Sequence, residues 1–242
     1  MKLLQFKDIC LTYDIEILKD INFTVYEGDF LAIIGPSGCG KTSILSLISG
    51  LCSKTSGEII KKDKLKTAYM LQKDSLLEWR DVLGNAKIGL EVTKSVSNEN
   101  LDYINNLIET YGLSEFKKNF PRELSGGMRQ RAALIRTLAV KPEILLLDEA
   151  FSALDYQTKL VVTRDVVNIL KKEKKTAIMV THDISEAVSM ANRVIVMSKR
   201  PGNIIKSIDL EFKEDDPLKR RDDILFKKYF NEIWECIEVK YE

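Results

Sequence analysis

The sequence lacks the features that mark disulfide-rich, metal-binding or membrane-spanning proteins. Its four cysteines, at positions 10, 39, 52 and 236, form no Cys-x-x-Cys pair and no metal-ligand cluster, which suggests a reducing compartment. No apolar run approaches the roughly 18 residues that a membrane-spanning helix needs. Residues 1–8 also lack the long apolar core of a signal peptide, so we expect no signal peptide here.

Neither sign of charge dominates. The 37 Lys and Arg residues nearly balance the 36 Asp and Glu residues, for a formal net charge of +1. This balance argues against a nucleic-acid partner, which would require clustered positive charge. With 45% hydrophobic and 30% charged residues, the composition is that of a soluble globular protein. At 242 residues, one domain with a sizeable insertion fits the length as well as two domains do.

One glycine-rich stretch stands out among what is present. Residues 35–42 match Gly-x-x-x-x-Gly-Lys-[Ser/Thr], the phosphate-binding P-loop. The apolar run 30–34 before it fits a buried strand, and apolar residues recur at helical spacing between 44 and 48. Strand, glycine loop and helix follow in the order that a P-loop needs. The residues expected to bind nucleotide are Gly35, Pro36, Ser37, Gly38, Cys39, Gly40, Lys41, Thr42 and Ser43.

The P-loop predicts a site for nucleotide phosphates. Glycine accepts backbone angles that a side chain would obstruct, so the loop N–H groups can point at phosphate oxygens beside a helix N-terminus. Lys41 adds positive charge at the β- and γ-phosphates, and the Thr42 hydroxyl is placed to coordinate Mg²⁺. The same helix terminus could favour a Cys39 thiolate, but no second cysteine is nearby in the sequence. We therefore interpret Cys39 as filling a variable loop position.

Two acidic residues follow a second buried strand. The apolar run 144–147 ends in Asp148 and Glu149, as a buried parallel strand does when its end reaches a site. Asp148 can hold Mg²⁺ through its water shell. Glu149 is placed to orient or deprotonate an attacking water. Two adjacent carboxylates with separate roles favour hydrolysis over transfer to a bound acceptor.

Further segments resemble the motifs of ATP-binding cassette (ABC) ATPases and occur in that family's order. Residues 124–131, LSGGMRQR, resemble the LSGGQ signature, with Met128 where glutamine is commoner. Asp155 closes a segment similar to the D-loop. The remaining matches are Tyr13 at the A-loop position, Gln72 at the Q-loop position, and His182, the chain's one histidine, at the switch position.

This resemblance implies roles for those residues. Two ABC cassettes face each other head to tail, and the signature of one completes the ATP site of the other. His182 would contact the γ-phosphate, Gln72 would act in catalysis and in Mg²⁺ binding, and Asp155 would communicate across the interface. Tyr13 would stack on the adenine ring. The signature residues that act on the second cassette would be Ser125, Gly126, Gly127 and Met128.

The fold class that we predict is α/β: a P-loop NTPase with a RecA-like core and a mixed sheet. A single ABC ATPase domain would span residues 1–242. Short strands are expected at 3–9 and 21–26, on either side of a turn. Helical patterns from 82 to 139 predict a helical subdomain inserted between two strands of the core, in which Ser125 begins a helix.

The last part of the chain is expected to be helical. Residues 211–223 are strongly charged, and we expect them to face solvent. An amphipathic helix is predicted within 216–242, and we expect its apolar face to dock onto the core. The apolar stripe of this helix comprises Leu225, Tyr229, Ile233, Trp234 and Ile237.

A finer resemblance concerns transport. Residues 71–85 are similar to the Q-x-x-x-L-L-P-W-R-x-V-x-x-N segment of importers for nitrate, taurine and alkanesulfonates, with Glu78 in place of the usual proline. Residues 197–204 are similar to that group's S-x-R-P-G-x-I turn. Trp79 either meets a membrane partner or belongs to the core of the helical subdomain. That group also includes transporters for vitamin precursors, so the solute stays open.

We therefore expect the ATP-hydrolysing subunit of a membrane ABC importer, with ATP and Mg²⁺ as cofactors. Its partners would be membrane-spanning permease subunits, a second ABC ATPase subunit in a homodimer and, indirectly, a solute-binding protein. It would lie peripherally on the cytoplasmic face of the cell membrane. The alternatives are a non-transport ABC ATPase, for example in cluster assembly, and a catalytically silent module. The intact Lys41, Asp148, Glu149 and His182 argue against the silent module.

Overall fold

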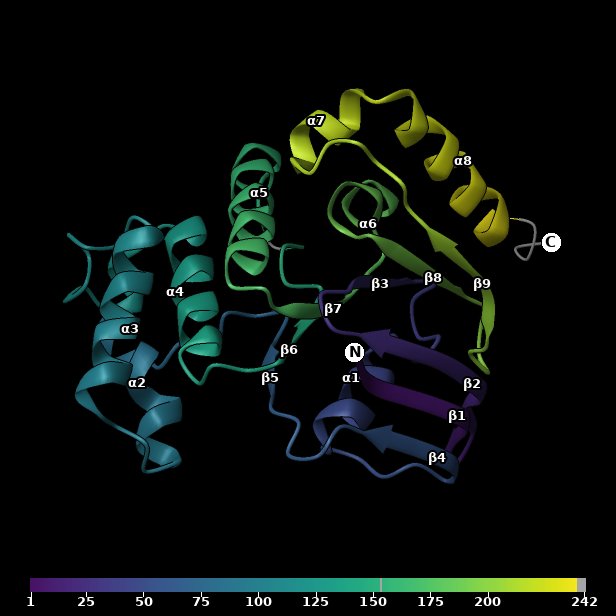
Figure 1. Cartoon of the computed structure of the whole chain (residues 1–242), viewed down its shortest axis with the longest axis horizontal. Coiled ribbons are helices and arrows are strands. Elements are labelled where there is room, and N and C mark those ends of the chain that lie inside the picture. Colours follow the sequence, from purple (N-terminus) through teal and green to yellow (C-terminus); the bar gives the residue numbers. More distant parts are fainter. Residues whose placement is uncertain (153, 239–242) are drawn as a thin grey trace.

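The computed structural model describes residues 1–152 and 154–238, and its strands form two sheets (Figure 1). The six-stranded sheet has the order β5 (Thr67–Met70), β6 (Ile144–Asp148), β7 (Thr176–Thr181), β3 (Phe30–Ile34), β8 (Arg193–Met197) and β9 (Ile204–Asp209). Its neighbouring strands pair in parallel except β8 and β9, which are antiparallel. The predicted mixed sheet is therefore confirmed.

A smaller antiparallel sheet has the order β2 (Glu16–Tyr26), β1 (Lys2–Thr12) and β4 (Ser56–Lys61). Both β1 and β2 are longer than the strands predicted from the sequence. Leu11 and Leu18 are buried and pair with each other beyond the expected ends. Irregularities in the register of this pair interrupt the strict alternation of apolar and polar residues, which made the strands look shorter.

Helices cover the large sheet and form a separate group at one end of the molecule (Figure 1). The separate group lies between β5 and β6 in the chain and comprises α2 (Val82–Val92), α3 (Asn98–Thr110), the 3₁₀ turn η1 (Pro121–Glu123) and α4 (Gly126–Leu138). They lie in the region, residues 82 to 139, where the sequence predicted helices. The other helices are α1 (Lys41–Ser49), α5 (Tyr156–Lys172), α6 (Ile184–Met190), α7 (Pro217–Asp222) and α8 (Ile224–Glu238).

Both faces of the large sheet are buried. Along β3, Ala32 and Ile34 belong to one apolar cluster, which includes residues of α2 to α6 and α8. Leu31 and Ile33 belong to a second cluster, which includes residues of α1 and of the small sheet. Burial on both faces explains why the parallel strands read as continuous apolar runs. The P-loop therefore leaves the sheet from a strand fixed on both sides.

The prediction for residues 211–223 is wrong in part, because Arg220 is only 5% exposed. Its guanidinium donates to the carbonyl oxygens of Ala191 (2.7 Å) and Ser189 (3.4 Å), at the C-terminal end of α6. It also donates to the carbonyl of Glu214 (2.9 Å) and lies over the Phe212 ring, 4.9 Å from the ring centroid. A basic side chain that satisfies free carbonyls at a helix end can be buried at low cost.

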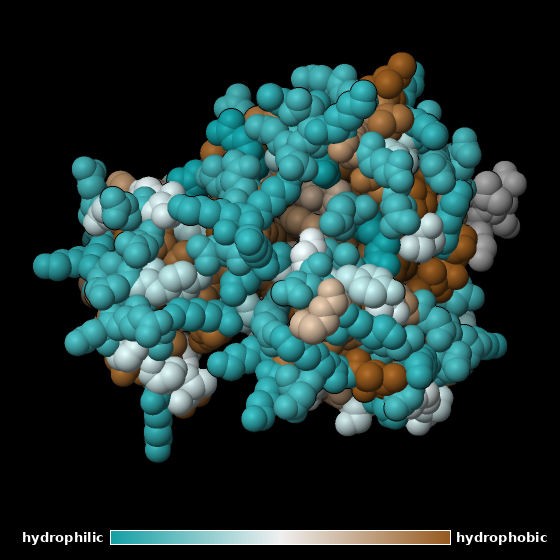
Figure 2. All heavy atoms as spheres, viewed as in Figure 1, coloured by the Kyte–Doolittle hydropathy of each residue, from teal (hydrophilic) through white to brown (hydrophobic). Residues whose placement is uncertain are grey.

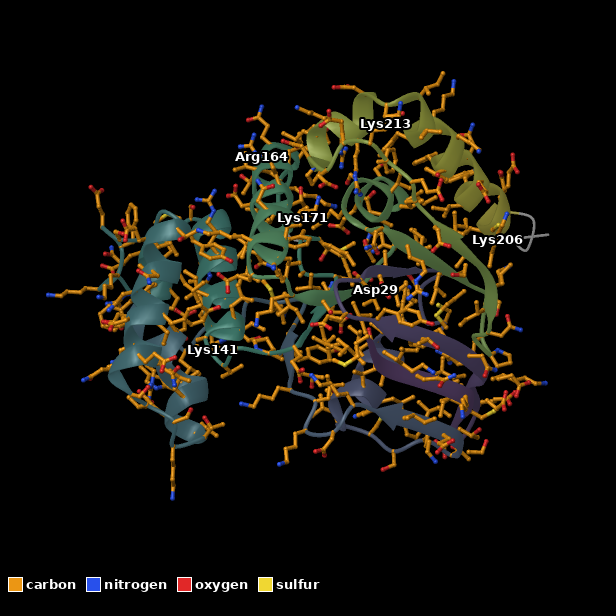
Figure 3. All side chains as sticks on the ribbon, viewed as in Figure 1. Asp29, Lys141, Arg164, Lys171, Lys206 and Lys213 are labelled. Carbon is orange, nitrogen blue, oxygen red and sulfur yellow. The ribbon has the colours of Figure 1, made fainter. Side chains whose placement is uncertain are left out.

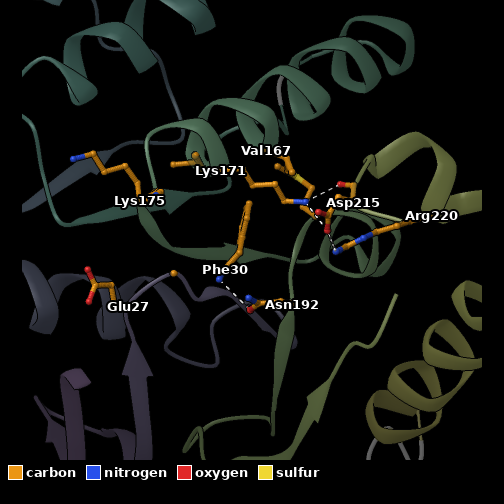
Figure 4. A pocket seen from close by; sticks show the side chains of 12 residues that line it. Glu27, Phe30, Val167, Lys171, Lys175, Asn192, Asp215 and Arg220 are labelled. Atoms are coloured by element: carbon orange, nitrogen blue, oxygen red, sulfur yellow. Dashed lines mark hydrogen bonds and ion pairs between the residues drawn. The ribbon is translucent and has the colours of Figure 1, made fainter. Parts of the chain in front are cut away.

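The predicted C-terminal helix is divided into α7 and α8, and residues 239–242 lie outside the described residues. A cavity of about 480 Å³ beside α7 lies at the end of β3 opposite the P-loop (Figure 4). At its edge, Lys171 of α5 forms an ion pair with Asp215 (2.8 Å). This ion pair joins α5 to the segment that leads into α7.

Docking of α8 onto the core is confirmed. Tyr229 and Ile233 are buried in the main cluster, and Glu232 forms an ion pair with Lys206 of β9 (2.8 Å). Figure 3 shows Lys206 beside the C-terminal half of α8. Hydrophilic side chains cover most of the face in Figure 2, with apolar patches at the upper right, where α7 and α8 lie. In the described part of the chain, no helix has the length and apolar character needed to cross a membrane.

Candidate functional site

The predicted site residues gather at one edge of the large sheet. The P-loop follows β3, Gln72 follows β5, Glu149 follows β6 and His182 follows β7. These four strands are parallel, so their carboxyl ends lie at the same edge. Ligand sites of open α/β sheets form at this edge. The fold therefore brings together residues that are more than 100 positions apart in the sequence.

The P-loop needs glycine at two positions. Gly38 and Gly40 have φ angles of 74° and 100°, in the left-handed region that side chains disfavour. A Cβ on Gly40 would also lie 2.5 Å from Cδ2 of Leu18 in β2. Gly40 is the N-cap of α1, so the loop runs directly into the N-terminus of that helix. Backbone angle and close packing together fix the loop.

Lys41 holds its charge inside the loop. Its buried ammonium group donates to the carbonyl oxygens of Gly35 (2.8 Å) and Pro36 (2.9 Å). A cavity of about 270 Å³ lies beside this group. Its lining residues are Tyr13, Ile17, Ser37, Gly38, Gly40, Lys41, Thr42, Ser43, Glu149 and Arg200. A buried cation, a helix N-terminus and glycine N–H groups suit such a cavity to phosphate.

Cys39 is buried, and its burial raises the pKa of the thiol above the usual range although Lys41 is close. The thiol is therefore neutral at physiological pH. This supports the interpretation of Cys39 as a packing residue of the loop rather than a reactive thiolate.

Thr42 and Asp148 meet at the base of the loop. The Thr42 hydroxyl donates to one carboxylate oxygen of Asp148 (3.0 Å), and the Tyr69 hydroxyl donates to the other (2.8 Å). A hydroxyl and a carboxylate are oxygen ligands of the kind that Mg²⁺ prefers, so these residues fit the ion. Gln72, the third predicted ligand, donates hydrogen bonds to Glu149 and Ser152 instead. Tyr69 is a site residue that the sequence did not predict.

Glu149 lies between Gln72 and His182, which follow the strands on either side of β6. One carboxylate oxygen is 3.3 Å from Nδ1 of His182, and the other accepts a hydrogen bond from the Gln72 amide (3.3 Å). The backbone of Glu149 has a φ of 44°, a strained conformation for a residue with a side chain. Its N–H donates to the carbonyl of Val180 in β7 (3.0 Å). The strand end therefore aims the carboxylate at the P-loop cavity.

A partly buried ion-pair cluster supports the loop that carries His182. Asp183 caps α6 and forms an ion pair with Lys159 of α5 (2.8 Å). Burial alone would raise the pKa of Asp183, but Lys159 and two backbone N–H groups lower it below its usual range. Lys159 also lies 3.5 Å from Glu186, which accepts a hydrogen bond from Thr181. His182 itself remains exposed beside this cluster.

The signature segment lies elsewhere. The Ser125 hydroxyl caps α4 by accepting a hydrogen bond from the Met128 N–H (3.4 Å), as predicted. A Cβ on Gly127 would lie 2.7 Å from Cγ2 of Thr158, so α4 packs closely on α5 there. Asp155 caps α5 through the N–H of Thr158 (3.0 Å). Of the described residues that line the P-loop cavity, none belongs to the signature segment 125–128.

Two arginines of α4 hold the loop that follows Gln72. Arg129 donates two hydrogen bonds to the Asp74 carboxylate (2.8 and 3.1 Å) and a third to Glu78 (3.0 Å). Arg136 donates to the carbonyls of Asp74 and Ser75 (2.6 Å each). The ion pair with Arg129 explains the glutamate at position 78, where the importer group usually has a proline. Trp79 is 74% exposed, so the core interpretation of this residue is wrong.

The turn between β8 and β9 supports the P-loop from outside. Arg200 donates twice to the carbonyl of Gly38 (3.1 and 3.0 Å). A Cβ on Gly202 would lie 2.0 Å from the carbonyl oxygen of Cys39. The Gly202 N–H donates to the carbonyl of Ile17 in β2 (2.8 Å). The sequence identified this turn only by its similarity to the S-x-R-P-G-x-I turn of the importer group. Its contact with the P-loop is a result of the fold.

A P-loop after a central parallel strand, with carboxylates at the ends of neighbouring strands, defines a P-loop NTPase. The family described as "ABC transporter" matches residues 18–152. The chain is 42% identical over 225 residues to the "uncharacterized ABC transporter ATP-binding protein YtlC" of Bacillus subtilis, covering 90% of this chain and 86% of that protein. It is 39% identical over 204 residues to the "aliphatic sulfonates import ATP-binding protein SsuB" of Bacillus cereus, covering 82% and 80%.

Among solved structures, the chain is similar to the dimeric post-hydrolysis state of the ATP-binding cassette MJ0796 bound to ADP and Pi. The TM-score is 0.73 with 28% sequence identity, covering 87% of this chain and 100% of that chain. The chain therefore belongs to the ABC transporter family, as one of its ATP-binding ATPase cassettes.

Proposed function

We propose that this chain is the ATP-hydrolysing subunit of a membrane ABC importer, lying peripherally on the cytoplasmic face of the membrane. In this role it couples ATP hydrolysis in a head-to-tail dimer to the uptake of a small solute. One observation carries the catalytic part of the proposal. Glu149 reaches the P-loop cavity with His182 at 3.3 Å from one carboxylate oxygen and Gln72 at 3.3 Å from the other.

Nucleotide binding rests on the P-loop. Lys41, the loop N–H groups and the N-terminus of α1 bind the β- and γ-phosphates. Tyr13, which is 61% exposed at the edge of the cavity, stacks on the adenine ring. Arg200 adds positive charge at the same cavity.

Thr42 and Asp148 would hold Mg²⁺ together with phosphate oxygens. When bound, the ion neutralises charge on the β- and γ-phosphates during transfer of the phosphoryl group. Tyr69 keeps the Asp148 carboxylate oriented through its hydrogen bond of 2.8 Å. Burial and the bond to Asp148 raise the pKa of Tyr69, so this hydroxyl stays protonated and remains a donor.

Glu149 acts as the general base. It accepts a proton from the attacking water, and His182 and Gln72 hold its carboxylate toward the γ-phosphate position. His182 also contacts the γ-phosphate. This division of roles fits the geometry, since Glu149 and Asp148 point to separate partners although they are adjacent in the sequence.

A second copy of the chain completes the site. ABC ATPase cassettes dimerise, and the similar cassette MJ0796 is dimeric in its ADP-bound structure. Ser125 to Met128 and the N-terminus of α4 form an anion-binding helix start that lines no part of the cavity in its own chain. In the dimer it covers the phosphates of the partner, with Asp155 at the interface.

The transport role is supported by the relatives. SsuB is named as an import protein for aliphatic sulfonates, and we propose a small organic anion of this kind as the leading solute class. Two exposed apolar side chains follow β5: Leu71 is adjacent to Gln72 in the sequence, and Trp79 is in the segment that follows it. A permease contact on this segment would reach the ATP site through Gln72. A solute-binding protein would deliver the solute to that permease. The relatives' names favour this function over a non-transport ATPase.

Purification of the tagged full chain from gently solubilised native membranes tests this proposal. We expect a polytopic membrane protein in about equal amount, and ATPase activity in the complex. Trp79→Ser should reduce recovery of the membrane partner, whereas the matched variant Trp234→Phe should not. Recovery with soluble partners alone would refute the importer subunit and favour the non-transport ATPase.

A further inference from the structure

A groove of about 460 Å³ lies between the P-loop and α8. Its lining residues are Gly35, Pro36, Ser37, His182, Ile184, Trp234, Ile237 and Glu238. Trp234 and Ile237 line it from α8, Ile184 lines it from α6, and Gly35, Pro36 and Ser37 line it from the P-loop. None of these α8 residues takes part in the chemistry proposed above.

The wall that α8 provides is firmly held. Ile233 and Tyr229 are buried in the core, and Glu232 is paired with Lys206 (2.8 Å; Figure 3). Trp234 is nevertheless 49% exposed. Its ring is parallel to that of Phe230 within 8°, with ring centroids 6.4 Å apart. A fixed helix thus presents a half-exposed indole beside the nucleotide site.

The groove faces the same way as the P-loop cavity. Ser37 lines both, and His182 lines the groove while contacting Glu149, which lines the cavity. Since the signature segment of a chain does not line its own P-loop cavity, a second copy must come over this face to provide it. That copy would then also cover the adjoining groove.

The lining chemistry fits a protein surface better than a free anion. Glu238 is the one lining residue with a full charge in the described part of the chain, and it accepts a hydrogen bond from Nε1 of Trp234 (2.6 Å). No lysine or arginine is among those described lining residues, so nothing there would hold a second phosphate or carboxylate. Half-exposed Trp residues next to apolar side chains are typical of protein–protein interfaces.

We infer that Trp234 and Ile237 of α8 form the outer part of the ATP-dependent interface between two copies of this chain. The inference rests on the proposed head-to-tail dimer and extends it to the C-terminal helix. In the closed dimer the second copy fills the groove and buries the indole. Because His182 and the P-loop form the inner wall, the contact forms only when the two ATP sites close.

The chain contains two tryptophans, which permits a matched fluorescence experiment. In the Glu149→Gln background, where hydrolysis is expected to be slow, Trp79→Phe leaves Trp234 as the reporter. Trp234→Phe leaves Trp79 as the control. We expect MgATP to shift the Trp234 emission to shorter wavelength in step with dimer formation measured by sedimentation. The shift should increase with protein concentration, and the Trp79 emission should not change.

Trp234→Ala and Ile237→Ala test the energetic part. Each should raise the dissociation constant of the ATP-bound dimer by about tenfold or more, which is the effect of removing an interface anchor. Trp234→Phe keeps an apolar ring and should retain most of the affinity. Circular dichroism identifies variants that fail to fold, and Ile237→Ala remains informative if Trp234→Ala is one of them.

The outcomes separate this inference from the proposed function. If Glu149→Gln forms no dimer with MgATP, the proposed dimer is wrong and the inference falls with it. If the dimer forms while Trp234 emission and the affinity of both alanine variants stay unchanged, the inference alone is overturned. An emission shift that is independent of protein concentration would mean that nucleotide or the same chain fills the groove, and this too overturns it.

Discussion

The hydroxyl of Thr42, in the first turn of α1, donates a hydrogen bond of 3.0 Å to the carboxylate of Asp148, the last residue of β6. This bond joins two segments that are 106 positions apart in the sequence. It brings together, at the base of the P-loop, the hydroxyl and the carboxylate that we propose would hold Mg²⁺. Variants of Thr42, Asp148 and Tyr69 can separate what each side chain contributes to Mg²⁺-dependent turnover.

Asp148→Asn should lower Mg²⁺-dependent ATP turnover by about 100-fold or more, because it removes the negative charge that balances the ion. Thr42→Val should act in the same direction. Tyr69→Phe removes only the bond that orients Asp148, and a loss of about tenfold is expected. Titrating turnover with Mg²⁺ checks the cause, since all three variants should need more Mg²⁺. Thr93→Val, at the end of α2, is the matched control, and an equal loss there would contradict the assignment.

Glu149→Gln should lower kcat by about 10² to 10⁴, because the amide cannot accept the proton of the attacking water. The affinity for ATP, measured by titration, should differ from that of the wild type by no more than about threefold. Glutamine is close in size to glutamate, so its side chain can keep the contact with His182. Glu91→Gln is the matched control on α2, where Glu91 forms an ion pair with Arg80 (2.6 Å). Wild-type turnover in Glu149→Gln would refute the role as general base.

Gly202→Ala should disturb the P-loop from outside the site. The added Cβ would lie 2.0 Å from the carbonyl oxygen of Cys39 and 2.9 Å from Cε of Met197. We expect a loss of about 1–3 kcal/mol in the free energy of unfolding, as for other overpacked positions, and weaker ATP binding. Urea unfolding and ATP titration measure the two effects. Asn203→Ala, at the next and exposed position, should change neither; normal ATP affinity in Gly202→Ala would show that the turn does not support the loop.

The sequence predicted those parts of the site that follow a buried strand. The P-loop at 35–42 and the pair Asp148 and Glu149 follow apolar runs, so local pattern was sufficient to predict them. Gln72 and His182 were identified only through the resemblance to ABC ATPases. The parallel sheet brings the four strand ends together at one edge. The fold class followed from the same strands.

Other residues could not be predicted, because their roles arise from contacts between distant segments. Tyr69 meets Asp148 across 79 positions, and Arg200 meets Gly38 across 162. Arg220 lies in a charged stretch, and composition alone predicts solvent exposure for such a stretch. Its burial depends on the end of α6, whose free carbonyls only the folded chain places beside it. Contacts of this kind leave no periodic signal in a sequence.

Asp74 gives a prediction about pH. Burial alone would raise the pKa of its carboxyl group, but the hydrogen bonds from Arg129 and from the Leu76 N–H lower the pKa below its usual range. A carboxyl group with a lower pKa in the folded state stabilises the fold above its unfolded pKa, about 3.9. The stabilisation is lost as the pH falls through the folded-state pKa.

Asp74→Asn should therefore lower the free energy of unfolding by about 1–3 kcal/mol at pH 7, the usual range for hydrogen bonds to a charged group. Urea unfolding should give a constant difference from wild type between about pH 7 and 5, and a shrinking one below about pH 4. Arg129→Gln should remove most of this pH dependence, because the charge that holds the carboxylate is gone. Asp63→Asn, on an exposed turn, should cost under about 0.5 kcal/mol at every pH. A difference that grows as the pH falls would contradict the ion pair between Asp74 and Arg129 as its source.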